Sequence, residues 1–65
     1  MSWALFIDTD GKAKVDFYCF ARKGRIISEH AERDGEDGAN AALTAYRLRE
    51  QREALRVAGQ QELPL

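Results

Sequence analysis

The chain has 65 residues, with ten basic and eleven acidic side chains and a formal net charge of -1. This length allows one domain and one hydrophobic core, and the near-neutral charge gives no general attraction to nucleic acid or membrane. So short a chain buries only about 60% of its unfolded surface, and it usually needs a disulfide, a metal or a partner for stability. Cys19 is the only cysteine, which excludes an internal disulfide and favours a small buried thiol in a reducing compartment.

The N-terminal sequence "MSWALFIDTDG" lacks a basic segment, and its apolar run is too short for a secretion signal. No stretch reaches the ~18 apolar residues of a membrane span. We therefore expect a cytoplasmic protein that does not enter a membrane. Seven arginines against three lysines, together with ten alanines, indicate a GC-rich bacterial genome or a phage or mobile element of such a host.

The first 22 residues predict a β-hairpin. Gly11 suits the left-handed position that ends a type I turn with a G1 bulge. The resulting register sets three pairs opposite each other: Asp8 and Lys12, Leu5 and Val15, Trp3 and Phe17. A turn shifted by one residue would mix lysine and aspartate into the core face, so we reject it. One face is then wholly apolar and comprises Trp3, Leu5, Ile7, Ala13, Val15, Phe17, Cys19 and Ala21.

The second strand is expected to continue through "VDFYCFAR", residues 15–22, and this gives the hairpin a second apolar face. Successive side chains of a strand point to opposite sides, so Phe6, Tyr18 and Phe20 would lie together on that face. In a small protein, one face of an antiparallel sheet packs on the core, and the other face can stay in water when its side chains are polar. We therefore expect another protein surface, most simply a second copy of the chain, to cover the second face.

A third strand is predicted over residues 25–30, after a turn around Lys23 and Gly24. If that turn has two residues, Ile26 joins the first apolar face and Ile27 lies beside Phe20 on the second. The acidic segment "ERDGEDGAN" then leads into the last element of the chain.

A single long helix is predicted from Gly38 to about Ala58, capped by Asp34 or Asp37 and ended by Gly59. About 21 helical residues span about 30 Å, whereas a seven-residue strand spans about 23 Å, so the helix should overhang the sheet. The sequence thus predicts one α+β domain over residues 1–59, with a flexible tail over residues 60–65. Its architecture is βββα: a three-stranded antiparallel sheet, made of the hairpin and the short third strand, followed by one long helix on the first apolar face.

The predicted helix carries two apolar stripes, although a surface helix needs only one. At 100° per residue, one stripe comprises Ala41, Ala45, Leu48 and Leu55, and the other comprises Ala39, Leu43, Tyr46, Ala54 and Val57. The second stripe gives a further reason to expect a protein partner.

Catalytic and metal sites find little support in the sequence. "DTDG", residues 8–11, begins like a calcium loop or like the first-strand aspartate of RNase H-like nucleases, but the further ligands are absent. His30, the only histidine, has no nucleophile and no orienting carboxylate at a suitable spacing. Cys19 stands in an apolar segment, whereas a reactive thiolate needs an electropositive setting. We predict no catalytic residue, no metal and no cofactor.

The function predicted from the sequence is that of a small non-enzymatic protein-binding module, an adaptor or inhibitor that occupies the surface of a partner protein. A homodimer is also expected. The predicted partner-binding residues are Phe6, Tyr18, Phe20, Ile27, Leu43, Tyr46 and Val57. The alternative is a nucleic-acid-binding or regulatory protein, because Arg49, Arg52 and Arg56 fall within about 60° on the helix and form an arginine stripe.

The stretches "DTDGKAKVDF" and "EDGANAALTAY" resemble the N-terminal part of HicB-type antitoxins, over about half of the chain. That resemblance implies a truncated RNase H-like sheet that masks a toxin partner. The "PGC"-like turn of the family is replaced by "ARKG", residues 21–24, and no residue roles carry over.

Overall fold

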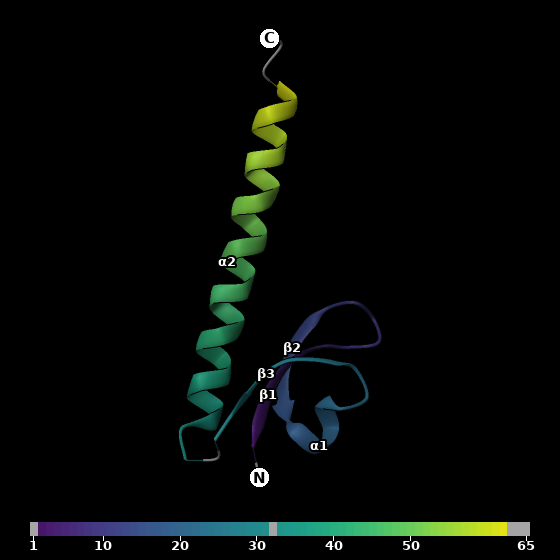
Figure 1. Cartoon of the computed structure of the whole chain (residues 1–65), viewed down its shortest axis with the longest axis vertical. Helices are drawn as coiled ribbons and strands as arrows, with labels where there is room; N and C mark the ends of the chain where they lie inside the picture. The colour runs from purple at the N-terminus through teal and green to yellow at the C-terminus, as the bar shows by residue number, and fades with distance from the viewer. Residues whose placement is uncertain (1, 32, 63–65) are drawn as a thin grey trace.

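The computed structural model describes residues 2–31 and 33–62. Its elements in chain order are β1 (Trp3–Ile7), β2 (Ala13–Phe17), α1 (Tyr18–Ala21), β3 (Arg25–His30) and α2 (Gly35–Glu62). The three strands form one antiparallel sheet in the order β2-β1-β3, and α2 runs along it (Figure 1). The predicted α+β architecture, with three strands followed by one long helix, is confirmed.

The hairpin has the predicted register. Trp3 pairs with Phe17 and Leu5 with Val15, and the Trp3 and Phe17 rings lie 4.4 Å apart between centroids. Gly11 has a φ of +82°, the left-handed conformation that ends the turn and that L side chains rarely adopt. The register was predictable because only this alignment puts every apolar side chain of both strands on one face.

The second strand is shorter than predicted, because it ends at Phe17 and the chain continues as the short helix α1. Helix α1 contacts β1, and its Ala21 forms a buried cluster with Ala4 and Phe6, against which Ile26 packs. Phe6 is only 2% exposed, so the expectation that Phe6 belongs to a surface for a partner is wrong. The chain itself covers the second face of its sheet over β1.

Helix α1 also changes the surroundings of its own residues. Cys19, predicted as a buried strand residue, is exposed. A strand running through residue 22 would have pointed Cys19 into the core, whereas one helical turn of four residues can bury only one side, and here it buries Ala21.

The third strand has the predicted bounds but not the expected neighbour. The turn at Lys23 and Gly24 implied pairing with β2, yet β3 pairs with β1, because α1 carries the chain beneath the sheet to its other edge. Ile26 lies opposite Phe6 and therefore on the α1 side, and the ladder then shifts register at a bulge. Gly24 fits because its Cα passes the Ile7 carbonyl so closely that a Cβ would lie 2.2 Å from that oxygen.

Helix α2 begins three residues earlier than predicted, at Gly35, and follows Asp34, whose carbonyl accepts a hydrogen bond from the Gly38 N–H at 2.8 Å. Both glycines let the helix approach the strands closely: a Cβ on Gly35 would meet the Trp3 ring, and one on Gly38 would lie 3.1 Å from His30 Nδ1. The helix therefore lies on the predicted Trp3, Leu5, Ile7, Val15, Phe17 face of the sheet.

The helix also continues past Gly59 to Glu62, so the predicted end at Gly59 is wrong. Of the predicted flexible tail, residues 60–62 belong to α2 and residues 63–65 lie outside the described residues. At about 1.5 Å per residue, the 28 residues of α2 span about 42 Å, whereas a five-residue strand spans about 17 Å. The expected overhang is present, and the molecule measures 52 × 23 × 11 Å.

Candidate functional site

Helix α2 has two halves in different surroundings. In the packed half, residues 35–46, the sheet-facing residues are buried or half-buried, and Ala39 is completely buried. Tyr46 still borders the same surface hollow as Ile7 and Ala13, at the turn end of the hairpin. In the free half, residues 47–58, every residue is exposed. Figure 1 shows this half, in green to yellow, extending beyond the sheet.

The free half exposes large apolar side chains. Leu48 is 50% exposed, Leu55 is 67% exposed and Val57 is 44% exposed. Leu48 and Leu55 are seven residues apart and so lie on one side of the helix, which faces away from the sheet. An exposed leucine alone is unremarkable, but a pair at this spacing on a helix without a covering layer is typical of helices that dock into a groove.

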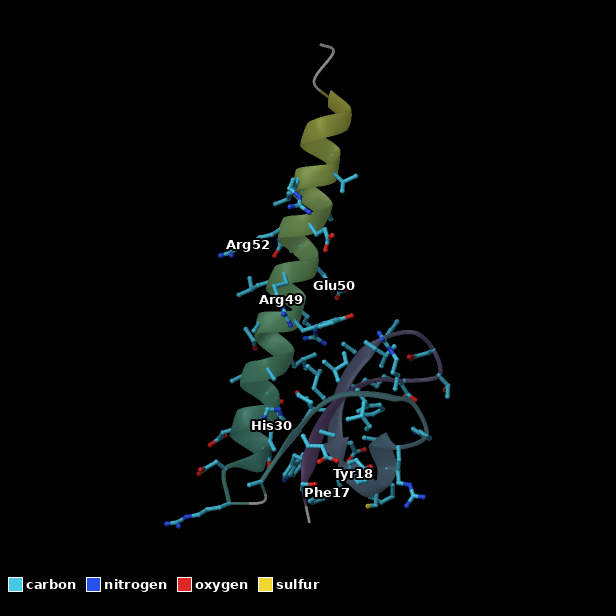
Figure 2. All side chains as sticks on the ribbon, viewed as in Figure 1. Phe17, Tyr18, His30, Arg49, Glu50 and Arg52 are labelled. Atoms are coloured by element: carbon cyan, nitrogen blue, oxygen red, sulfur yellow. The ribbon has the colours of Figure 1, made fainter. Side chains whose placement is uncertain are left out.

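The arginines predicted as a stripe lie on the free half and are all exposed. Arg52 lies within about 60° of both Leu48 and Leu55 around the helix. Arg56 forms the only ion pair found within the free half, with Glu53 at 3.7 Å. In Figure 2, Arg52 points away from the side on which the sheet lies, whereas Glu50 points toward that side. The side of the free half that carries Leu48 and Leu55 is therefore apolar and basic.

The structure separates the predicted partner-binding residues. Leu43 and Tyr46 are half-buried on the packed half, so the stripe that covers the sheet is theirs, and the Leu48 and Leu55 stripe is the exposed one. The predicted partner-binding residues of the helix came from the sheet-covering stripe, of which Val57 on the free half is 44% exposed. The signal that separates the two stripes is the position of Gly35 and Gly38, which mark the sheet-facing side of the first turn.

The aromatic residues of α1 form a second, smaller exposed group. Phe20 is 57% exposed and Tyr18 is 38% exposed, whereas Ile27 is half-buried in β3. Helix α1 lies on the opposite side of the sheet from α2, so the predicted partner-binding residues do not form one continuous surface.

A charged cluster surrounds the hairpin turn. Lys14 Nζ lies 2.9 Å from Asp8 Oδ2 and 3.0 Å from Asp10 Oδ2. The hydrogen bonds from Lys14 and from the Thr9 N–H lower the pKa of Asp8. The Lys12 N–H and then Lys14 lower the pKa of Asp10, and both carboxylates raise the pKa of Lys14. The lysine thus occupies the position between the two carboxylates that a cation would take, and the cluster stabilises the turn.

Ser28 and His30 are neighbours on the α2 side of β3. The Ser28 hydroxyl and His30 Nε2 lie 2.9 Å apart, while His30 Nδ1 is close to Gly38 of the helix. This pairing was not predicted, because the spacing of two residues becomes a contact only when both lie on one strand face. Held between strand and helix, the pair joins β3 to the packed half of α2.

The hollows of the surface are shallow. One of about 460 Å³ is lined by Glu50, Glu53, Ala54, Val57 and Ala58, all from α2, so no second element faces it. Among residues 2–31 and 33–62, no three histidine, cysteine, aspartate or glutamate side chains gather as metal ligands. In the same part of the chain, none of the helices combines the length and apolarity needed to cross a membrane.

Comparison with known proteins does not place the chain in a family. No protein-family model, no curated protein and no solved structure matches it. The resemblance to HicB-type antitoxins thus rests on the two quoted stretches alone.

Proposed function

We propose that this protein is a non-enzymatic protein-binding module, an adaptor or inhibitor that docks the free half of α2 into an apolar groove of a partner protein. The observation that carries the proposal is the exposure of Leu48 and Leu55 on a helix that extends beyond its own sheet. Arg47 and Glu50, at the start of the free half, still border a hollow lined by the hairpin, whereas Leu48 and Leu55 stay exposed. A binding partner supplies the missing contacts.

The chemistry of the docking side, the one that carries Leu48 and Leu55, favours a partner with carboxylates around its groove. Along the helix, Arg52 lies between the two leucines. Around the helix, Arg49, Arg52 and Arg56 all lie to the same side of the leucines. A second copy docked on the same stripe would bring its own Arg52 into the interface, where two like charges repel and lose hydration. An acidic partner pairs these arginines and buries the leucines at the same time.

The shallow hollows support a binding role over an enzymatic one. A pocket that orients a substrate encloses most of it and carries convergent polar groups. The hollow beside Glu50 and Glu53 is lined by one helix only.

The test compares what two variants capture from lysate of the native host after nuclease treatment. Leu48→Glu with Leu55→Glu removes the apolar stripe, while the matched control, Ala54→Glu with Val57→Glu, adds the same charge to the free half away from that stripe. We expect a protein that the wild type and the control retain and the leucine variant loses. Hydrogen exchange of residues 47–58 should then slow when that purified protein is added. Identical capture by all three chains would contradict the proposal.

Nucleic-acid binding is the second candidate, because Arg49, Arg52 and Arg56 are exposed together on the free half. Binding through phosphates weakens steeply with salt, since each contact releases counterions. If this function holds, fluorescence anisotropy with mixed DNA and RNA should show binding at about 50 mM salt that is largely lost at about 200 mM. Changing all three arginines to glutamine should abolish it, and Leu48→Ala with Leu55→Ala, which changes no charge, should retain it. No binding at low salt would exclude this candidate.

A further inference from the structure

We propose that the outer edge of β2 pairs with the β2 edge of a second copy, antiparallel and centred on Val15, to form a six-stranded sheet. This surface is separate from the free half of α2, and the proposal does not rest on the proposed function. The sequence predicted a homodimer through the aromatic second face of the sheet or through an apolar stripe of the helix. The interface proposed here is instead the edge of β2.

The backbone of β2 offers regularly spaced hydrogen-bonding groups at this edge. Tyr18 N–H donates to Ser2 carbonyl at 2.8 Å, and Asp8 N–H donates to Lys12 carbonyl at 2.9 Å. In an antiparallel ladder every second residue bonds to the neighbouring strand, so residues 12, 14, 16 and 18 face β1. The backbone groups of Ala13, Val15 and Phe17 therefore face away from the sheet.

The two edges of the sheet differ in regularity. β2 keeps an unbroken register with β1 over all its five residues, whereas β3 has a bulge opposite the Leu5–Phe6 step. Bulges are a common way to prevent a sheet edge from pairing with another chain. β2 contains neither a bulge nor a proline. Within residues 2–31 and 33–62, only β1 lies beside it.

The side chains of β2 are complementary to their own copy in this alignment. Pairing Val15 with Val15 of a second copy sets Lys14 opposite Asp16 of that copy, and Asp16 opposite its Lys14. Opposite charges directly across an antiparallel pair are favourable, whereas like charges are unfavourable. On the other face, the same alignment places Ala13 opposite Phe17 and keeps the apolar residues together under the two α2 helices.

In a single copy, one outward-facing N–H group of β2 makes its hydrogen bond within the chain. Asp16 Oδ1 accepts a hydrogen bond from the Phe17 N–H at 2.7 Å, and that N–H is one of those facing outward. In the dimer the Ala13 carbonyl of the second copy accepts this hydrogen bond instead. The Asp16 carboxylate is then released to meet Lys14 of the second copy.

The experiment measures mass by analytical ultracentrifugation over a range of concentrations, because dimerisation follows mass action. We expect the wild type to dimerise as its concentration rises. Asp16→Lys should be monomeric, because two lysines then face each other across the edge. Phe20→Glu and Leu55→Glu change the two other exposed apolar groups and should stay dimeric. A 1:1 mixture of Asp16→Lys with Lys14→Glu should restore a dimer, since each chain of the mixed pair faces opposite charges.

A second measurement uses the unaltered chain and so does not depend on whether a variant folds. The amide proton of Val15 should exchange at least about tenfold more slowly at high than at low protein concentration, as should that of Ala13. The proposal is overturned if the wild type stays monomeric at about millimolar concentration. It is also overturned if Phe20→Glu or Leu55→Glu abolishes the dimer while Asp16→Lys keeps it.

Discussion

The packed and free halves of α2 both carry apolar residues at helical spacing, but they have very different surroundings. Only the packed half has a sheet beneath it, and there Ala39 is completely buried, whereas Leu55 is 67% exposed. An apolar stripe on a helix therefore does not by itself show what covers it.

The two halves of α2 also contribute differently to the stability of the fold. The packed half contributes to folding, because burial of apolar surface against β1, β2 and β3 offsets the entropy of ordering the chain. The free half extends the helix from an existing nucleus, and this costs far less than starting a new helix in water. Mutations in the two halves should therefore affect different observables.

The largest expected difference comes from one substitution made in each half. Ala39→Glu would bury an unpaired carboxylate against the sheet and should cost more than about 3 kcal/mol, most of the stability of a domain this small. The same change at Ala54 on the free half should alter the free energy of unfolding by less than about 0.5 kcal/mol. Urea unfolding followed by circular dichroism measures both. Equal costs would show that the free half is covered in solution.

A gentler pair of substitutions separates stability from binding. Leu43→Ala removes half-buried methyl groups from the packed half and should cost about 1–2 kcal/mol. Leu55→Ala should leave the free energy of unfolding within about 0.5 kcal/mol of the wild type and should weaken capture of the partner protein. If Leu43→Ala weakens that capture as much as Leu55→Ala does while the chain stays folded, the docking side has been misplaced.

The smallest effect concerns pH and the charged cluster at the hairpin turn. The pKa values of Asp8 and Asp10 are lowered in the folded chain, so their contribution is complete above about pH 4 and is lost as the pH falls through the folded values. The pKa of Lys14 is raised, so its contribution is complete below about pH 10 and is lost above that.

Thermal melts at low protein concentration, across pH 2–7, test this assignment. Lys14→Gln should flatten the acid limb of the stability curve. The control is Glu53→Gln on the free half, which removes an exposed pair with 3.7 Å between the charged atoms and should leave the curve unchanged. A steep acid limb retained by Lys14→Gln would show that other carboxylates control acid unfolding.

The parts of the fold that were predictable are those where local chemistry and face alternation agree. Gly11 marks the turn, and the apolar alternation around it leaves one register, which is the one observed. Helix α1 was not predicted, because the aromatic residues of "YCFA" favour a strand and no capping residue marks a helix start. Missing α1 also led to the wrong neighbour for β3 and to the wrong expectation of an exposed Phe6.

The candidate site was predictable only in part. Helix length and strand length suffice to predict an overhang, and the arginine stripe follows from spacing alone. Which stripe faces the sheet depends on how closely the first turn approaches β1 and β3, and that approach is set by Gly35 and Gly38. Glycine has a low helix propensity, so the predicted helix began only at Gly38 and left out Gly35.

Hydrogen exchange of the whole chain, followed residue by residue by NMR at low concentration, compares the packed and free halves of α2 in solution. We predict that amides of residues 42–46 exchange only through global unfolding, with protection equal to that of β1. Amides of residues 51–58 should open locally and exchange at least about tenfold faster, since every residue of the free half is exposed. Equal protection along α2 as far as Val57 would contradict the account, because it would show that the free half is held by contacts as firmly as the packed half.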